Sequence, residues 1–308
     1  MISRRNIRVK VMQTLYGIET MEFDIKQGQE VKTLQKHFDQ TRQLFVYLIY
    51  FITEVARYSE TSAHQRASKH LPSEEDLHVN IKSAGNEIIW RIFQDASYQK
   101  ALKDDKPFLL LDKELVRKIY QQLAVTPEYE EYIATESRDK KGEKDILTFI
   151  FSSLLLPNND FISHIEELFT NWDDDCDMVN LLVINYLQKP GSYNFQEILS
   201  KEKWEYGKKL LETVLEKKET TLALIKPKLN NWDSERIATL DMILMEMGVC
   251  EFLFFETIPP KVTINEYIDL AKDYSTPQSG QFVNGILDNI HKDLVKENTM
   301  NKVNFRKS

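Results

Sequence analysis

The chain has 308 residues, of which 42% are hydrophobic and 29% are charged. This length suits two domains or one elongated domain, and it is enough to bury a sizeable core. Nine glycines and nine prolines are too few for an all-β, collagen-like or low-complexity protein. The two cysteines, Cys176 and Cys250, exclude a disulfide framework and a four-thiolate zinc site. They indicate a reducing compartment.

The net charge of −8 is unevenly distributed along the chain. Residues 1–10 carry +4, residues 11–200 carry −11 and residues 201–308 carry −1. An acidic protein does not coat duplex DNA non-specifically. A short basic end on an acidic body can still contact a few phosphates. We therefore expect nucleic-acid binding to be local and weak unless a second component contributes.

No segment reaches the roughly 18 uncharged apolar residues of a membrane span. The longest apolar run is Leu44–Ile52, which Glu54 and Arg57 follow closely. The hydrophobic region of a signal peptide is also missing after the basic start. We expect a soluble, cytoplasmic protein.

Apolar residues recur at helical spacing along most of the chain. The first helix has an apolar stripe at Ile7, Val11, Leu15 and Ile18, and its Arg4 lies one turn from Arg8. Further helices are predicted near 33–58, 77–102, 112–123, 127–136, 143–155, 159–170, 175–188, 201–218, 220–230, 234–255, 265–274 and 277–296. No internal repeat is visible. The pattern predicts an all-α, multi-helix bundle.

Cap and breaker residues mark several helix ends. Ser73 and Asp233 are predicted N-caps, and Pro259 stops the helix that precedes it. Thr276 and Pro277 are expected to provide a cap and a proline at the first helical position.

The clearest linker signal is Lys189-Pro190-Gly191-Ser192. It divides the chain into an N-terminal helical subdomain, residues 1–195, and a C-terminal helical subdomain, residues 196–297. The first subdomain contains the basic N-terminal helix and extra helices. Residues 298–308 are expected to form a frayed polar tail.

Most catalytic and metal-binding patterns are missing. The acidic run Asp173–Asp177 lacks the glycine and glutamate of a calcium loop, because Met178 and Ile184 occupy those positions. Its acids are better explained as favourable charges at a helix N-terminus. The six histidines form no metal-binding pattern, and nucleophile-elbow, Walker and dinucleotide-loop patterns are not found. We expect no enzyme, no metal and no cofactor.

One cluster contradicts the charge of its surroundings. Arg4, Arg5 and Arg8 lie in an acidic chain and are expected to contact phosphates from a helix N-terminus. The alternative is a solvated, frayed end. Gln13 and Tyr16, further along the helix, would add amide and stacking contacts to a nucleic acid. Their alternatives are helix surface and core.

Two segments together resemble the NusB family of transcription antitermination factors. The first is Arg4-Arg5-Asn6-Ile7-Arg8 followed by Met12-Gln13-Thr14-Leu15-Tyr16. The second contains Pro260-Lys261-Val262-Thr263-Ile264-Asn265-Glu266 and Phe282-Val283-Asn284-Gly285. The resemblance covers about residues 1–20 and 200–295. Residues from about 60 to 195 have no counterpart, so the first subdomain resembles an expanded version of the family's.

The resemblance implies an all-helical fold of two small bundles. Members of the family bind boxA-type single-stranded RNA with the ribosomal protein NusE. They join the RNA polymerase antitermination complex during ribosomal RNA transcription. By position, Arg4, Arg5 and Arg8 correspond to RNA-contacting arginines. Gln281 and Phe282 correspond to a second RNA-proximal patch.

The chain also departs from the family pattern. Asn6 stands where many members have an arginine, Gln281 stands where a lysine is common, and Gln278 replaces a frequent acid. Asn265 and Asn284 are expected to be buried amides with structural roles.

Three hypotheses follow from these observations. The leading one is an RNA-binding antitermination factor. The alternative is a helical protein-interaction scaffold of the transcription machinery that has lost most RNA binding. The third is an enzyme, because a related helical domain is fused to RNA cytosine methyltransferases. The missing glycine-rich cofactor loop argues against it.

Overall fold

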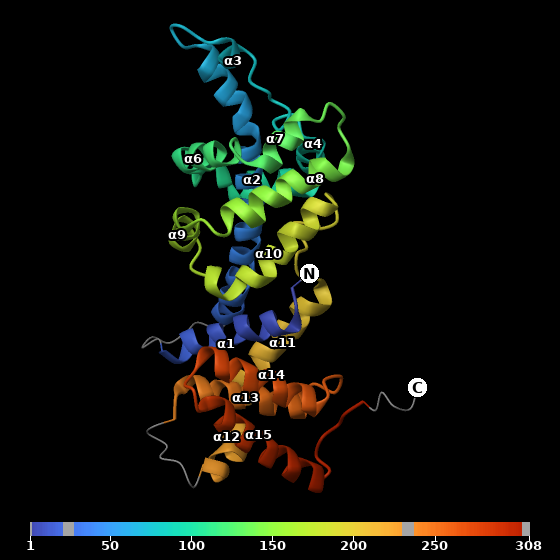
Figure 1. The fold of residues 1–308 in the computed structure, drawn as a ribbon. Coiled ribbons are helices and arrows are strands. Elements are labelled where there is room, and N and C mark those ends of the chain that lie inside the picture. Colours follow the sequence, from blue (N-terminus) through green and yellow to red (C-terminus); the bar gives the residue numbers. More distant parts are fainter. Residues whose placement is uncertain (1, 21–27, 230–236, 304–308) are drawn as a thin grey trace. The chain divides into compact units, whose positions relative to one another are not determined.

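The computed structural model describes residues 2–20, 28–229 and 237–303 (Figure 1). All regular secondary structure in these ranges is helical, as the apolar periodicity predicted. Contacts divide the chain into two compact units. We call residues 39–198 the middle unit and residues 2–38 with 199–308 the terminal unit.

Contacts therefore join the first helix to the C-terminal helices, whereas the sequence placed it in a subdomain of residues 1–195. The two units differ in charge. The middle unit carries 27 acidic and 17 basic side chains, a net charge of −10. The rest of the chain carries 21 acidic and 23 basic side chains, a net charge of +2.

The terminal unit is built around α13, which is buried on nearly all sides from Ile243 to Phe252. Close packing requires small residues at two points. A Cβ at Gly207 would lie 2.8 Å from Ile7, and one at Gly248 would lie 2.9 Å from Leu287. Its elements are α1 (Arg4–Thr20), α11 (Lys201–Glu216), α12 (Lys218–Ile225), η3 (Lys226–Leu229), α13 (Thr239–Phe254), α14 (Pro260–Tyr274) and α15 (Ser279–Lys296).

The middle unit packs shorter helices against residues 39–67 of α2 (Gln29–Ala67). Aromatic side chains form much of its core, with Phe45 stacked on Phe195 and edge-on to Tyr186. Its other elements are α3 (Glu74–Leu77), α4 (Glu87–Gln94), α5 (Ala96–Asp105), η1 (Pro107–Leu109), α6 (Lys113–Leu123), α7 (Pro127–Ala134), α8 (Lys140–Phe149), η2 (Ile150–Leu155), α9 (Asn159–Leu168) and α10 (Trp172–Gln188).

Several predicted helix boundaries can be compared with the structure. Ser73 caps α3, with its hydroxyl accepting from the Asp76 N–H, as predicted. The single helix predicted over 77–102 is wrong, because Asn86 and Asp95 each cap a new helix there. The predicted cap at Asp233 lies outside the described residues.

The predicted starts of the last two helices are also wrong. α14 begins at Pro260 rather than near residue 265, because a proline fits the first turn of a helix. α15 begins at Ser279 rather than at Pro277. The Thr276 N–H there donates to the Ser279 hydroxyl, which itself donates to Asp241.

The first residues of the predicted tail are ordered against α13, so a frayed tail is wrong for them. The Lys302 ammonium donates to the carbonyl oxygens of Glu251, at 2.7 Å, and Phe255, at 2.8 Å. The Val303 N–H donates to the Glu256 carbonyl oxygen. A cation at this end of α13 satisfies carbonyls that the helix leaves unpaired. Residues 304–308 lie outside the described residues.

Among residues 2–20, 28–229 and 237–303, no single helix has the length and apolar character to cross a membrane. Lys140–Leu155 and Asn159–Leu168 meet that test only as a pair bent by 87°.

Candidate functional site

The basic first turn of α1 is the candidate site. Ser3 begins the helix: its hydroxyl accepts from the Asn6 N–H at 3.2 Å, and its carbonyl accepts from the Ile7 N–H. The first turn has no acidic residue. Helix N-termini favour acids and disfavour cations by roughly 0.3–1 kcal/mol each. Arg4 and Arg5 therefore do not stabilise this helix end through its dipole.

Arg4 and Arg5 are accessible and lightly held. Their side chains are 46% and 37% exposed, and they form ion pairs with Glu202 at 3.6 Å and Asp273 at 2.5 Å. Arg4 also lies 5.6 Å from the centre of the Tyr206 ring. Surface ion pairs of this kind contribute about 0–1 kcal/mol. Both guanidinium groups can exchange these partners for a phosphate at little cost.

Arg8 is placed quite differently, with only 2% of its side chain exposed. Its Nε and Nη2 donate to the two oxygens of Glu251 at 2.8 and 3.1 Å, and its Nη1 donates to Glu266 at 3.1 Å. Burial alone would lower the pKa of Arg8, but the Glu251 carboxylate outweighs it and holds that pKa above its ordinary value. Arg8 therefore faces the protein interior and not the surface.

Glu251 is the centre of a buried cluster. Its carboxylate also accepts hydrogen bonds from Tyr206 at 2.6 Å, Thr263 at 2.8 Å and Tyr267 at 3.0 Å. Burial, with the nearby Glu251 charge, raises the pKa of both tyrosines. These donors and Arg8 supply hydrogen bonds to both oxygens of the buried carboxylate. We call Arg8, Tyr206, Glu251, Thr263, Glu266 and Tyr267 the Arg8–Glu251 cluster.

This cluster joins α1 to α11, α13 and α14, and it was missed by the sequence analysis. The signal was a glutamate inside the apolar run Val249–Phe252. A buried carboxylate needs a cation or several donors, and Glu251 has both. The cluster determines where the first turn of α1 lies in the terminal unit.

Gln13 and Tyr16 extend the same helix away from the arginines. Gln13 is half-buried and Tyr16 is 45% exposed. Tyr16 is eleven residues after Arg5, so the two share a helix face about 17 Å apart along the axis. They can contact one extended ligand but not one nucleotide.

The second predicted patch is only partly accessible. Gln281 is exposed, whereas Phe282 is 7% exposed and packs in the core. The end of α14 links this patch to α1. Asp273 pairs with Arg5, and its neighbour Lys272 contacts the position where Gly280 would carry a Cβ. The first turns of α1 and α15 therefore adjoin the same end of α14.

The predicted burial of two amides is wrong. Asn265 on α14 and Asn284 on α15 are both exposed. Asn284 lies three residues after Gln281, so both amides lie on one exposed face of α15. The periodicity of α15 explains the exposure of Asn284, because the apolar residues Phe282, Val283, Ile286 and Leu287 occupy the opposite face.

The described residues contain no group of three or more histidine, cysteine or acidic side chains arranged to hold a metal ion. Cys176 and Cys250 are free thiols, and burial raises the pKa of Cys250 to about 12. At neutral pH this buried thiol is protonated and is therefore a poor nucleophile.

Comparisons with known proteins identify relatives of the C-terminal part of the chain. The NusB family matches residues 167–292. A transcription antitermination protein NusB of Salinibacter ruber is 41% identical over 98 residues, which are 32% of this chain and 61% of that protein. One of Methylacidiphilum infernorum is 40% identical over 101 residues, 33% of this chain and 70% of the relative. One of Desulfatibacillum aliphaticivorans is 46% identical over 79 residues, which are 26% of this chain and 55% of that protein.

The matched part thus spans about three-fifths of the Salinibacter relative's length. No solved structure matches the chain. The family match does not include α1, but the Arg8–Glu251 cluster connects α1 to helices that it does include. The middle unit, apart from residues 167–198, lies outside the match.

Proposed function

Because the chain belongs to the NusB family, we propose that it acts in transcription antitermination and binds boxA-type single-stranded RNA together with NusE. In this proposal it joins the RNA polymerase complex during ribosomal RNA transcription, and it catalyses no reaction. The relatives that it matches are named transcription antitermination proteins.

The observation that carries the RNA-binding proposal is the basic first turn of α1. Arg4 and Arg5 are exposed at a helix end that disfavours cations, and only surface acids pair with them. A charge that costs stability where it stands is typical of a binding site. Phosphate contact is the simplest use of two adjacent, exposed guanidinium groups.

We assign different roles to the predicted residues. Arg4 and Arg5 contact phosphates, and Tyr16 stacks on a base at the far end of the same face. Gln13 and Gln281 supply amide contacts, and the exposed Asn284 joins Gln281 in doing so. Arg8 and Phe282, both buried, hold α1 and α15 in place rather than touching RNA.

A partner protein is part of the proposal because the basic surface is small. Phosphate contacts to single-stranded RNA give a salt slope of about −0.7 each. Two or three contacts therefore give only about −1.4 to −2.1 by that rule. Such binding is weak, and NusE would extend the contact surface and add affinity.

Fluorescence anisotropy of a labelled boxA-type strand and a scrambled strand tests this proposal. The protein is titrated alone and with NusE from its own organism, at two salt concentrations. We expect selective, partner-dependent binding with a shallow salt dependence. Equal binding of both strands under all conditions would contradict it.

The scaffold hypothesis remains the second candidate, and two observations favour it. Both exposed arginines already pair with acids, and the middle unit carries a net charge of −10. A scaffold should capture NusE or another transcription component while ignoring boxA-type RNA at low salt. Capture of NusE with no RNA binding in any setting would favour it over RNA binding.

A further inference from the structure

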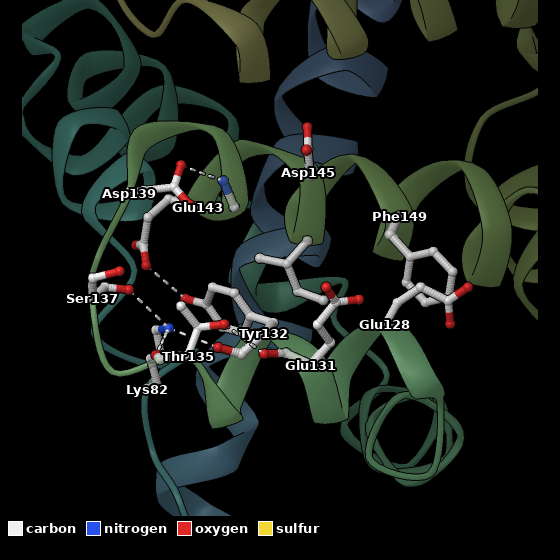
Figure 2. A pocket seen from close by; sticks show the side chains of 12 residues that line it. Lys82, Glu128, Glu131, Tyr132, Thr135, Ser137, Asp139, Glu143, Asp145 and Phe149 are labelled. Atoms are coloured by element: carbon white, nitrogen blue, oxygen red, sulfur yellow. Dashed lines mark hydrogen bonds between the residues drawn. The ribbon is translucent and has the colours of Figure 1, made fainter.

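A second surface, within the middle unit, is independent of the RNA proposal. A pocket of about 380 Å³ lies between α7, α8 and the loop that carries Lys82 (Figure 2). Tyr132, Ile146 and Phe149 form its apolar walls. Figure 2 shows Lys82 at one end of the pocket and Phe149 beside Glu128 at the other.

The pocket carries unbalanced negative charge. Glu128, Glu131 and Asp145 line it, and all three are exposed. None of the three forms an ion pair with another described residue, whereas other exposed acids, such as Glu202, Glu114 and Asp288, do. Three uncompensated carboxylates around an apolar wall attract a cation that also has an apolar part.

The chain's own Lys82 occupies one end of the pocket and shows how an alkyl ammonium binds there. The Lys82 ammonium donates to the carbonyl oxygens of Tyr132 at 2.6 Å, Thr135 and Ser137 at 3.3 Å. It also lies 4.5 Å from the centre of the Tyr132 ring. Carbonyls at the end of α7 and an aromatic face thus bind an alkyl ammonium. They occupy its donors, and Lys82 forms no ion pair with the three carboxylates among the described residues.

A second hollow of about 590 Å³ continues the pocket, since Lys82 and Thr135 line both. It exposes two large apolar side chains, Trp90 at 61% and Ile81 at 49%. Arg138, also in its wall, is occupied by the Gly85 carbonyl oxygen at 2.6 Å. The two hollows form one groove, acidic along the first, with Trp90 and Ile81 exposed among charged side chains in the second.

We propose that this α7–α8 groove binds an extended, lysine- and arginine-rich segment of a partner protein. Basic side chains would meet Glu128, Glu131 and Asp145, and their aliphatic stems would cover Phe149. Apolar or guanidinium groups of the same segment would lie on Trp90. RNA is excluded by its charge. A small polyamine would leave Trp90 and Ile81 in the second hollow uncovered.

A peptide titration with the full-length protein tests the proposal. The probe is a fluorescein-labelled nonapeptide of three lysine–leucine–arginine repeats, followed by anisotropy at 50 mM and 500 mM salt. Three surface charge contacts correspond to about a tenfold change in Kd at low salt. We expect the variant Glu128→Gln/Glu131→Gln/Asp145→Asn to bind the peptide about tenfold more weakly. Trp90→Ala should show a smaller loss of affinity.

A matched control separates the groove from the overall charge of the unit. The variant Asp160→Asn/Glu166→Gln/Glu167→Gln removes the same charge from exposed positions on α9. It should lose less than twofold in affinity. Equal losses in the two triple variants would overturn the proposal. So would binding of a peptide with glutamate at every basic position, or displacement of the basic peptide by micromolar spermidine.

Discussion

The two units use charge in opposite ways. The terminal unit buries a full ion pair, Arg8 with Glu251, and exposes arginines nearby. The middle unit pairs largely buried acids with more exposed arginines, Asp105 with Arg42 and Asp76 with Arg66, both at 2.8 Å, and it exposes an excess of acids. Burial also separates two arginines within the terminal unit. Arg4 and Arg8 lie four positions apart on α1, but Arg4 is exposed and Arg8 is buried. One is available for a ligand and the other supports the fold.

The largest expected effect comes from breaking the buried pair. Arg8→Ala leaves Glu251 buried and without its cation, which costs about 3–5 kcal/mol of unfolding free energy. Urea denaturation followed by circular dichroism measures this. Arg5→Ala, in an exposed pair on the same helix, is the control and should change stability by less than about 0.5 kcal/mol. Similar losses in both variants would remove the distinction between the two arginines.

A second prediction concerns the buried acid Glu246, which is only 6% exposed on α13. Burial, moderated by Lys218, raises its pKa from 4.5 to about 7. The folded state then binds this proton more tightly than the unfolded state. The resulting stabilisation is complete below pH 4.5 and is lost as the pH rises through 7. The expected loss is about 2 kcal/mol, discounted for solvent screening.

Chemical denaturation between pH 4.5 and 8 measures how steeply the unfolding free energy falls with pH. Glu246→Gln should flatten it, whereas Glu256→Gln, at an exposed position, should leave it unchanged. An unaltered slope in Glu246→Gln would show that other groups cause the pH dependence.

In the middle unit, Asp175→Asn should cost less than the change at Arg8. Asp175 accepts from the Thr41 hydroxyl and the Asn171 amide, each at 2.6 Å. Weakening two such bonds at a buried site costs about 1–2 kcal/mol. Thermal denaturation of Asp175→Asn beside Asp177→Asn, at an exposed position on the same helix, measures the difference. A loss as large as that of Arg8→Ala would contradict the contrast between the units.

The smallest expected effect is a gain. Asp273→Asn removes the surface acid that pairs with Arg5 and should raise RNA affinity about two- to threefold, the value of one exposed ion pair. Asp269→Asn, an exposed acid on the same helix, is the control and should give a smaller gain. Weaker RNA binding by Asp273→Asn would assign Asp273 a positive role in binding.

The sequence predicted the helical class, most helix positions and the unusual basic end, because these depend on local periodicity and charge. It did not predict that Arg8 is buried, since one helical turn separates Arg8 from the exposed Arg4 and only packing against Glu251 distinguishes them. The sequence also did not predict the helix ends within 77–102, because Asn86 and Asp95 cannot be recognised as caps from their polarity alone. The burial predicted for Asn284 was wrong because the prediction did not take into account the apolar residues on the opposite face of the helix.

The most direct test of the account is RNA affinity in the variant Arg4→Gln/Arg5→Gln, measured by anisotropy with boxA-type RNA and NusE at low salt. The account predicts at least a tenfold loss of affinity, since each charge-assisted bond to phosphate contributes about 1.5–3 kcal/mol. Unfolding free energy should stay within about 0.5 kcal/mol of the unmodified protein. Unchanged RNA affinity in a stably folded double variant would contradict it.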